Sequence, residues 1–208
     1  MNVGRPRPVE LDGRTVWTAI WKRPVEGRVP LQGVNLAGDD QADRSVHGGP
    51  DKAVYAYGAE DTDWWEAELG RPLGAGAFGE NLTVRGVPVS EAVIGERWAV
   101  GSTLLEVAQP RLPCFKLGLR MDDPRFLARF AAAGRPGAYL RVIREGDIGA
   151  GDAVEVAGRP EHGVTSALVS RAILGEPDLL TEASQAPELP AALRSWMQER
   201  ADRRAARG

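Results

Sequence analysis

Short strand-like segments separated by Gly and Pro turns constrain the fold of this chain most. Up to about residue 160, segments rich in β-branched and aromatic residues alternate with turns such as Gly146-Asp147 and Gly151-Asp152. The expected strands are residues 15–21, 53–57, 81–84, 97–100, 103–107, 139–143 and 153–156. Many short strands with frequent turns favour a closed or nearly closed β-barrel, so we predict a mainly β fold.

Two helices are expected within this strand-rich part. Residues 60–69 begin among capping residues and end at Gly70. Residues 124–133 have Asp123 as the expected cap and Pro124 at the first helical position. The barrel is therefore expected to carry interspersed helices.

The strand pattern stops after residue 160. Helical spacing is expected at residues 170–174, 177–183 and 190–200, while the Arg- and Ala-rich end at 199–208 is expected to fray. The last of these helices presents four apolar side chains on one side: Leu189, Leu193, Trp196 and Met197. We predict a β-barrel domain at residues 1–160 and a small three-helix extension at 161–208.

The composition is that of a soluble globular protein. The formal net charge is -3, so no overall charge draws the molecule to nucleic acid or to an anionic membrane. No segment approaches the roughly 20 apolar residues that span a bilayer, and the first residues lack an apolar signal sequence. The single Cys forms no intrachain disulfide, which suits a reducing compartment. We expect a cytoplasmic protein that binds neither nucleic acid nor membrane.

Two common kinds of site are not expected. A zinc site needs several closely spaced ligands, whereas His47 and His162 are far apart in the sequence. Residues 74–79 match the dinucleotide pattern G-x-G-x-x-G, but a helix and Arg71-Pro72 precede them and a strand-like segment follows. Since a dinucleotide loop needs a strand before it and a helix after it, we expect no zinc and no bound NAD or flavin.

Residues 40–52 form a Gly-rich, charged segment before an expected strand. Backbone N–H groups of a Gly turn can hold an anion, and Arg44, His47 and Lys52 add positive charge or hydrogen-bond donors. The alternative is a solvated surface turn in which Asp51 pairs with Lys52. This segment alone favours the solvated turn.

Residues 78–81 place an acid and an amide beside a flexible Gly. Glu80 and Asn81 carry the donors and acceptors that read the edge of a pterin or purine. Alternatively, Asn81 only closes a turn and Glu80 is an exposed charge. The segment does not decide between these interpretations.

The segment around Cys114 is the most suggestive for chemistry. Pro110 and Pro113 stiffen the chain, and Arg111 and Lys116 are close enough in sequence to favour a thiolate. The alternative is a buried Cys that acts as a small apolar side chain. The two interpretations are balanced on these residues alone.

Taken in order, three segments resemble the bacterial stand-alone MOSC proteins, a family named for the C-terminal domain of molybdenum-cofactor sulfurases. They are His47 to Val54, Phe78 to Thr83 and Gln109 to Leu117, and the similarity extends to residues 137–142 and to the helical tail. The resemblance implies a β-barrel of the pyruvate-kinase-barrel type with a cleft for the molybdenum cofactor in its molybdopterin form.

By position in that resemblance, Cys114 is the catalytic residue that ligates molybdenum or carries a persulfide. Arg111, Lys52 and His47 would lie near the cofactor phosphate. Phe78, Gly79, Glu80 and Asn81 would lie near the pterin. The chain departs from many relatives at Val46, where they have a second His, and at Phe115, where they have Trp.

The resemblance implies reduction of small N-hydroxylated substrates with electrons from an external reductase. One soft thiolate ligand suffices for a metal already held by the pterin's dithiolene sulfurs. A sulfur carrier with a persulfide on Cys114 and no metal is the first alternative. A cofactor-binding or delivery module without turnover is the second, and a homodimer is left open.

Overall fold

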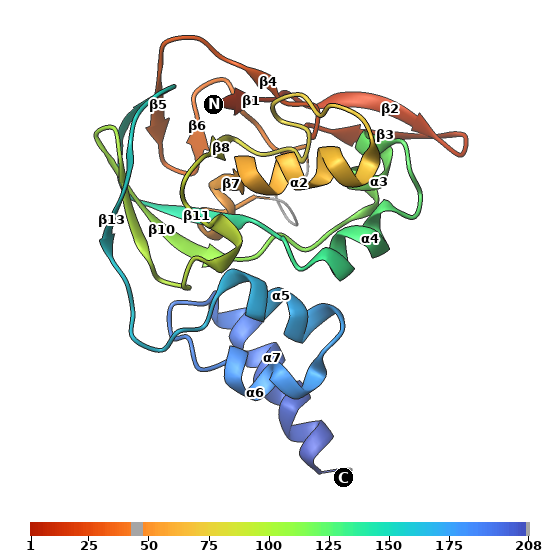
Figure 1. Ribbon diagram of the computed structural model, residues 1–208, viewed down its shortest axis with the longest axis vertical. Coiled ribbons are helices and arrows are strands. Elements are labelled where there is room, and N and C mark those ends of the chain that lie inside the picture. Colours follow the sequence, from red (N-terminus) through yellow and green to blue (C-terminus); the bar gives the residue numbers. More distant parts are fainter. Residues whose placement is uncertain (43–47, 207–208) are drawn as a thin grey trace.

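The computed structural model describes residues 1–42 and 48–206. Its centre is a six-stranded sheet that curls into a half-barrel (Figure 1). The strand order is β13 (Val154–Gly158), β9 (Arg97–Val100), β10 (Thr103–Gln109), β11 (Ala138–Arg144), β7 (Val54–Gly58) and β8 (Leu82–Val84). All neighbours are antiparallel except β7 and β8, which are parallel.

A smaller sheet packs against the open side of this half-barrel. It contains β12 (Gly146–Gly149), β5 (Arg28–Gln32) and β6 (Asn35–Leu36). Alternate residues of β5 are buried, and Val29 and Leu31 join Ile148 and Leu36 in the core of the large sheet. The expected mainly β, barrel-like fold with interspersed helices is therefore confirmed.

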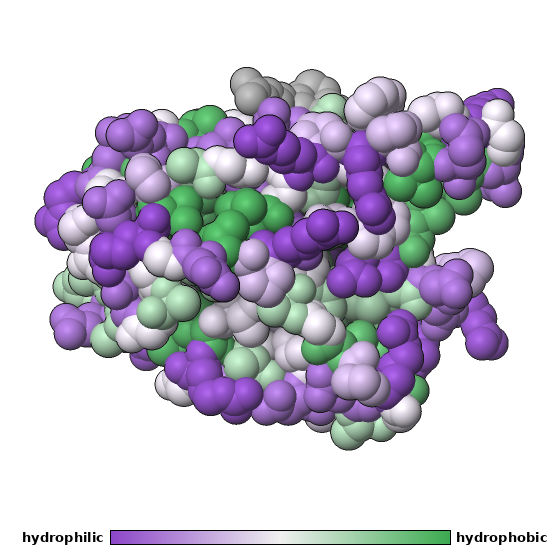
Figure 2. Space-filling model, turned by 90° about the horizontal axis from the view of Figure 1, so that it is seen from above, coloured by the Kyte–Doolittle hydropathy of each residue, from purple (hydrophilic) through white to green (hydrophobic). Residues whose placement is uncertain are grey.

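Two further antiparallel pairs complete the strands. β1 (Asn2–Val3) pairs with β4 (Arg23–Pro24), and β2 (Arg7–Leu11) pairs with β3 (Arg14–Thr18). The β2–β3 hairpin projects from one side of the molecule (Figure 1), and the surface seen from above also protrudes on that side (Figure 2).

Three helices lie beside the large sheet: α2 (Ala59–Leu69), α3 (Phe115–Met121) and α4 (Phe126–Ala133). Two short 3₁₀ turns accompany them, η1 (Pro50–Lys52) and η2 (Val89–Glu91). Between these helices and β7 lies a second apolar cluster, which is mainly aromatic: Tyr55, Tyr57, Trp65, Phe78, Phe126 and Phe130. This cluster forms the floor beneath the site described below.

The C-terminal part is helical, as expected. It contains α5 (Ser166–Leu174), η3 (Pro177–Leu179), α6 (Leu180–Ala183) and α7 (Ala191–Ala205). Its buried side chains, including Val169 and Met197, belong to the same apolar cluster as the large sheet. The boundary at residue 160, as a division into two domains, stays a prediction.

Several local predictions were wrong. Gly146-Asp147 begins strand β12 instead of forming a turn, and the strand expected at 15–21 ends at Thr18. The helix expected from Pro124 begins at Phe126. Residues 199–205 continue α7 instead of fraying. β1, β2, β4, β5 and β6 were not predicted, because strands of only two to five residues give little local signal.

Helix α3 was also not predicted. Gly118 lies in its middle, and Gly disfavours a helix interior. A Cβ on Gly118 would lie 2.9 Å from Leu127 Cδ1, so packing against α4 explains the Gly. No helix in the described part of the chain is long and apolar enough to cross a membrane.

If sheet and extension form one cooperative unit, Met197→Ala should lower the free energy of unfolding of the whole protein. Met197 is fully buried in the shared core, so the loss should be about 2–5 kcal/mol. Denaturant unfolding followed by circular dichroism should show one transition at a lower midpoint. Gln198→Ala, on the exposed side of α7, is the control and should change stability by less than about 0.5 kcal/mol. A second, separate transition would contradict the shared core.

Candidate functional site

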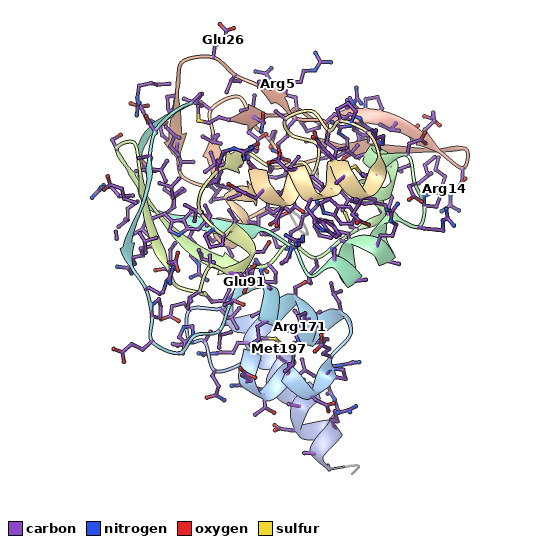
Figure 3. The ribbon with its side chains drawn as sticks, viewed as in Figure 1. Arg5, Arg14, Glu26, Glu91, Arg171 and Met197 are labelled. Atoms are coloured by element: carbon purple, nitrogen blue, oxygen red, sulfur yellow. The ribbon has the colours of Figure 1, made fainter. Side chains whose placement is uncertain are left out.

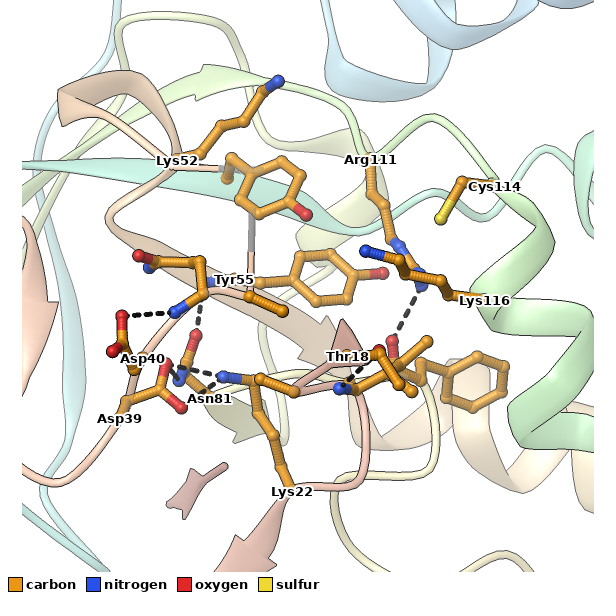
Figure 4. Close-up of a pocket in the computed structure, with 17 residues that line it drawn as sticks. Thr18, Lys22, Asp39, Asp40, Lys52, Tyr55, Asn81, Arg111, Cys114 and Lys116 are labelled. Atoms are coloured by element: carbon orange, nitrogen blue, oxygen red, sulfur yellow. Dashed lines mark hydrogen bonds and ion pairs between the residues drawn. The ribbon is translucent and has the colours of Figure 1, made fainter. Parts of the chain in front are cut away.

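A pocket opens at the end of the large sheet, where five segments distant in sequence meet (Figure 4). The lining comes from residues 18–22, 39–42, 52–55, 78–81 and 111–116, together with Tyr139 of β11. The predicted residues Lys52, Phe78, Gly79, Asn81, Arg111 and Cys114 all line it. His47 lies outside the described residues.

Arg111 is a buried cation in the wall of this pocket. Its Nη1 donates a 2.7 Å hydrogen bond to the carbonyl oxygen of Phe78, and its guanidinium lies 5.4 Å from the Tyr55 ring centroid and 5.9 Å from that of Phe130. Among the described residues no carboxylate forms an ion pair with it. Buried charges normally have such a partner, so the wall presents positive charge to whatever enters the pocket.

Arg111 is positively charged despite its burial. Burial opposes the charge, but the ionisable Tyr55, Tyr139 and Cys114 side chains around it leave the pKa of Arg111 raised. Burial also raises the pKa of Tyr139, against the effect of Arg111. The tyrosines are therefore neutral at physiological pH, and the guanidinium is positive.

Cys114 precedes helix α3 directly. It is the N-cap residue in an extended conformation, and its carbonyl oxygen accepts the first backbone hydrogen bond, from Leu117 at 2.8 Å. The side chain is partly buried and lies on the same side of the pocket as Arg111 and Lys116 (Figure 4). The sulfur is thus fixed between a helix start and a pocket wall that carries positive charge.

A buried ion pair that the sequence did not reveal supports the opposite side of the pocket. Lys22 Nζ lies 2.5 Å and 2.6 Å from the two carboxylate oxygens of Asp39. Asp39 also accepts from the backbone N–H of Gly4 at 2.7 Å and from Asn81 Nδ2 at 2.8 Å. Burial lowers the pKa of Lys22, while Asp39 opposes that shift. Neither residue belongs to a recognisable motif, so only the folded chain brings them together.

Asn81 connects three segments with its side-chain amide. Its Oδ1 accepts from the backbone N–H of Tyr55 at 3.0 Å, and its Nδ2 donates to the carbonyl of Asn2 and to Asp39. The amide lines the pocket while it joins β7 to the N-terminal strand. Its expected contact with a pterin stays a prediction.

Glu80 is buried and turned toward its own loop. Its carboxylate accepts from the backbone N–H groups of Gly76 and Phe78, at 2.7 Å and 3.0 Å, and from the Thr83 hydroxyl at 3.0 Å. Burial raises the pKa of Glu80, and these hydrogen bonds counteract the shift. Glu80 does not line the pocket, so its visible role is to shape the 74–79 loop that carries Phe78.

The same loop explains the misleading G-x-G-x-x-G pattern. Helix α2 precedes it and strand β8 follows it, so it is not a dinucleotide loop. Gly79 has φ +76°, and a Cβ there would lie 2.9 Å from Ile20 Cγ1. These glycines allow the loop to pack closely against residues 20–22, which border the pocket.

Lys52 reaches the pocket from the 3₁₀ turn η1. Burial lowers the pKa of Lys52, and neighbouring Asp51 opposes that effect. Asp51 pairs with Arg141, which also pairs with Glu106 at 2.9 Å. The carboxylate of Asp51 is therefore shared with Arg141 of the sheet and does not serve Lys52 exclusively. The amino group of Lys52 points away from the guanidinium of Arg111 (Figure 4), so the two cations serve different parts of the pocket.

Within the described ranges, no group of three or more His, Cys, Asp or Glu side chains is arranged to hold a metal ion. Comparison with known proteins identifies the family instead. The MOSC domain family matches residues 43–155, more than half of the chain. The chain belongs to the MOSC family.

Two of the similar relatives, YflK and YiiM, are stand-alone MOSC proteins. The Bacillus subtilis protein YflK is 40% identical over 171 residues, which are 82% of this MOSC protein and 77% of YflK. Escherichia coli YiiM is 35% identical over 145 residues, 68% of this chain and 65% of YiiM. A Gibberella moniliformis protein named Reductase is 34% identical over 194 residues, 90% of this chain but only 34% of the fungal protein.

Solved structures agree with this assignment. The crystal structure of YiiM from Geobacillus stearothermophilus matches with a TM-score of 0.78 and 31% identity, over 96% of both chains. YiiM from E. coli matches with a TM-score of 0.73 and 27% identity, over 86% of this chain and 87% of that one. The agreement includes the C-terminal helices, since almost the whole chain aligns.

Because Asp39 holds Lys22 and Asn81 together in the interior, Asp39→Asn should destabilise this MOSC protein. Breaking one partner of a buried ion pair typically costs about 3–5 kcal/mol. Denaturant unfolding measures the loss. Asp63→Asn, which removes an exposed partner of Arg85, is the control and should cost at most about 1 kcal/mol. Equal effects of the two changes would mean that the Asp39 network does not stabilise the pocket wall.

Proposed function

We propose that this protein is an oxidoreductase that reduces small N-hydroxylated compounds at a molybdenum cofactor bound in the pocket. The observation that carries the proposal is the presence, in one pocket of a MOSC protein, of a lone thiol beside a buried cation that has no acidic partner among the described residues. The fungal relative named Reductase supports the reaction type.

The pocket residues fit a cofactor that combines phosphate with sulfur-ligated metal. Among the described residues, the lining has four cations, Lys22, Lys52, Arg111 and Lys116, and two carboxylates, Asp39 and Asp40. Asp39 is already paired with Lys22. The excess positive charge suits a phosphate, which Arg binds with parallel N–H donors. The Cys114 thiolate is a soft ligand that suits molybdenum coordinated by sulfur.

The chain's own residues then have distinct roles. Arg111 would hold the phosphate, and Lys52 would add positive charge in another part of the pocket. The expected phosphate contact of His47 lies outside the described residues and stays a prediction. Phe78, Gly79 and Asn81 would border the pterin, and Glu80 would keep that border in shape through its loop. Cys114 would ligate the metal. When bound, the cofactor would supply the two-electron redox chemistry needed to cleave an N–O bond.

The electrons have to come from outside this chain. An N-hydroxylated compound gains two electrons and two protons and yields the N–H compound and water. Neither a flavin nor a nicotinamide motif occurs in the sequence. The protein named Reductase extends well beyond the part that matches this chain, which leaves room for further domains. We propose a separate reductase as the electron donor and, because a lone Cys suits a reducing compartment, the cytoplasm as the location.

A sulfur-carrier function is the second candidate, because the same partly buried thiol could carry a persulfide. The N-cap position of Cys114 and its cationic neighbours serve this role equally well. A cofactor-delivery module is the third candidate, and it would use the pocket without turnover.

Replacement of Cys114 by Ser should abolish reduction of an N-hydroxylated test compound, here benzamidoxime, driven by a chemical electron donor. A hydroxyl is a harder and far less acidic ligand than a thiol. The assay uses protein loaded with cofactor, and the amidine that it produces is measured by chromatography. Ser102→Ala, an exposed change in the turn before strand β10, is the control and should leave the rate unchanged.

Full activity in the Ser variant would remove Cys114 from the reaction and favour the delivery module. A wild-type protein that is loaded with molybdenum but inactive would also favour that module. Cyanide-releasable sulfur on Cys114, in protein that contains no molybdenum, would favour the sulfur carrier.

A further inference from the structure

Three arginines gather beside the pocket without an acidic partner. Arg7 begins strand β2, Arg71 follows the end of α2, and Arg120 lies in the last turn of α3. These three elements meet on the side of the molecule from which the β2–β3 hairpin projects (Figure 1). In the described part of the chain, none of the three arginines forms a salt bridge with a carboxylate.

The charges of Arg7 and Arg71 act on Arg120. Burial lowers the pKa of Arg120, and the charges of Arg7 and Arg71 lower it further, while Glu80 opposes them. Like charges repel, so a folded chain that holds three together bears a cost unless an anion offsets it. Elsewhere on this protein the arginines are commonly paired, as Arg28 is with Asp152 and Arg171 with Glu176.

One donor in this cluster is buried and unused. Arg120 Nε is shielded from solvent and has no hydrogen-bond partner. A buried N–H without an acceptor is rare in folded proteins. The folded chain therefore leaves this donor unsatisfied.

Helix capping explains the cluster only in part. Arg71 Nη2 donates a 2.9 Å hydrogen bond to the carbonyl of Met121, and a cation near the end of α3 suits the helix dipole. Capping does not account for the unused Nε of Arg120. It also does not account for Arg7, which belongs to a different element and lies 4.2 Å from the Trp21 ring centroid.

Two connections place the cluster at the edge of the pocket. Arg7 is the direct cross-strand partner of Thr18, which lines the pocket. Arg120 follows Lys116, another lining residue, by one turn of α3, so the two lie on the same face of the helix. Positive charge therefore continues from the pocket wall to the cluster.

We propose that Arg7, Arg71 and Arg120 form a second anion site, which binds the phosphate group of a ligand beside the mouth of the pocket. Phosphate matches the site because its oxygens accept from several guanidinium donors at once. Trp21 offers an apolar surface next to Arg7 for the organic part of the ligand. Two sources share this chemistry: a phosphorylated organic molecule and free inorganic phosphate.

Isothermal titration calorimetry of the full chain with inorganic phosphate, phenyl phosphate and phenol tests this site without any need for activity. The wild type should bind both phosphates and not phenol. Tighter binding of phenyl phosphate than of inorganic phosphate would identify an organic phosphate as the ligand class. Equal binding would identify the free ion.

Arg120→Gln should weaken the binding of both phosphates about tenfold or more, because a charge-assisted contact is lost. Arg7→Gln, at an exposed position on the hairpin, should act in the same direction and guards against a folding defect in α3. The control is Arg14→Gln, at the far end of the same hairpin (Figure 3), which should leave the affinity unchanged. No binding by the wild type, or an equal loss in the Arg14 variant, would overturn the proposal.

Discussion

The buried guanidinium of Arg111 is the constraint on which the rest of the site depends. A charge in the interior is costly unless neighbouring groups stabilise it. Here one carbonyl oxygen and two aromatic rings do so, and no carboxylate of the described chain contributes. The aromatic cluster is therefore both the second core of the protein and the support of its cationic pocket wall. An anion bound in the pocket would supply the negative partner that the described chain does not provide for Arg111.

The rest of the pocket consists of segments tied down by buried polar groups. Asp39 joins Lys22 to Asn81, Asn81 joins strand β7 to the N-terminal strand, and Glu80 closes the loop that carries Phe78. In a buried network whose polar groups all have hydrogen-bond partners, any other arrangement of the segments would leave a buried group unpaired. Such a network therefore favours one arrangement of the segments. The thiol of Cys114 is then held by helix α3 on the side opposite this network.

The sequence predicted the elements that have a strong local pattern. Strand β9 was predicted at its observed ends, and helix α2 was predicted to within one residue, because Gly70 gives a clear stop. Short strands such as β6 depend on pairing with distant segments and have no local signal. For the same reason the motif residues Arg111 and Cys114 could be named in advance, whereas Lys22, Asp39 and the three arginines beside the pocket could not. These residues are distant in sequence, and only the folded chain brings them together.

The central claim is that the pocket beside Arg111 and Cys114 holds a molybdenum cofactor. The most direct measurement is the molybdenum and pterin content of the protein purified from a molybdenum-replete host, beside the Arg111→Ala variant. The account predicts nearly one molybdenum and one pterin per chain in the wild type. It predicts a large loss of both in the variant, because a phosphate contact of about 1.5–3 kcal/mol disappears. A wild-type protein without molybdenum and pterin would contradict the account.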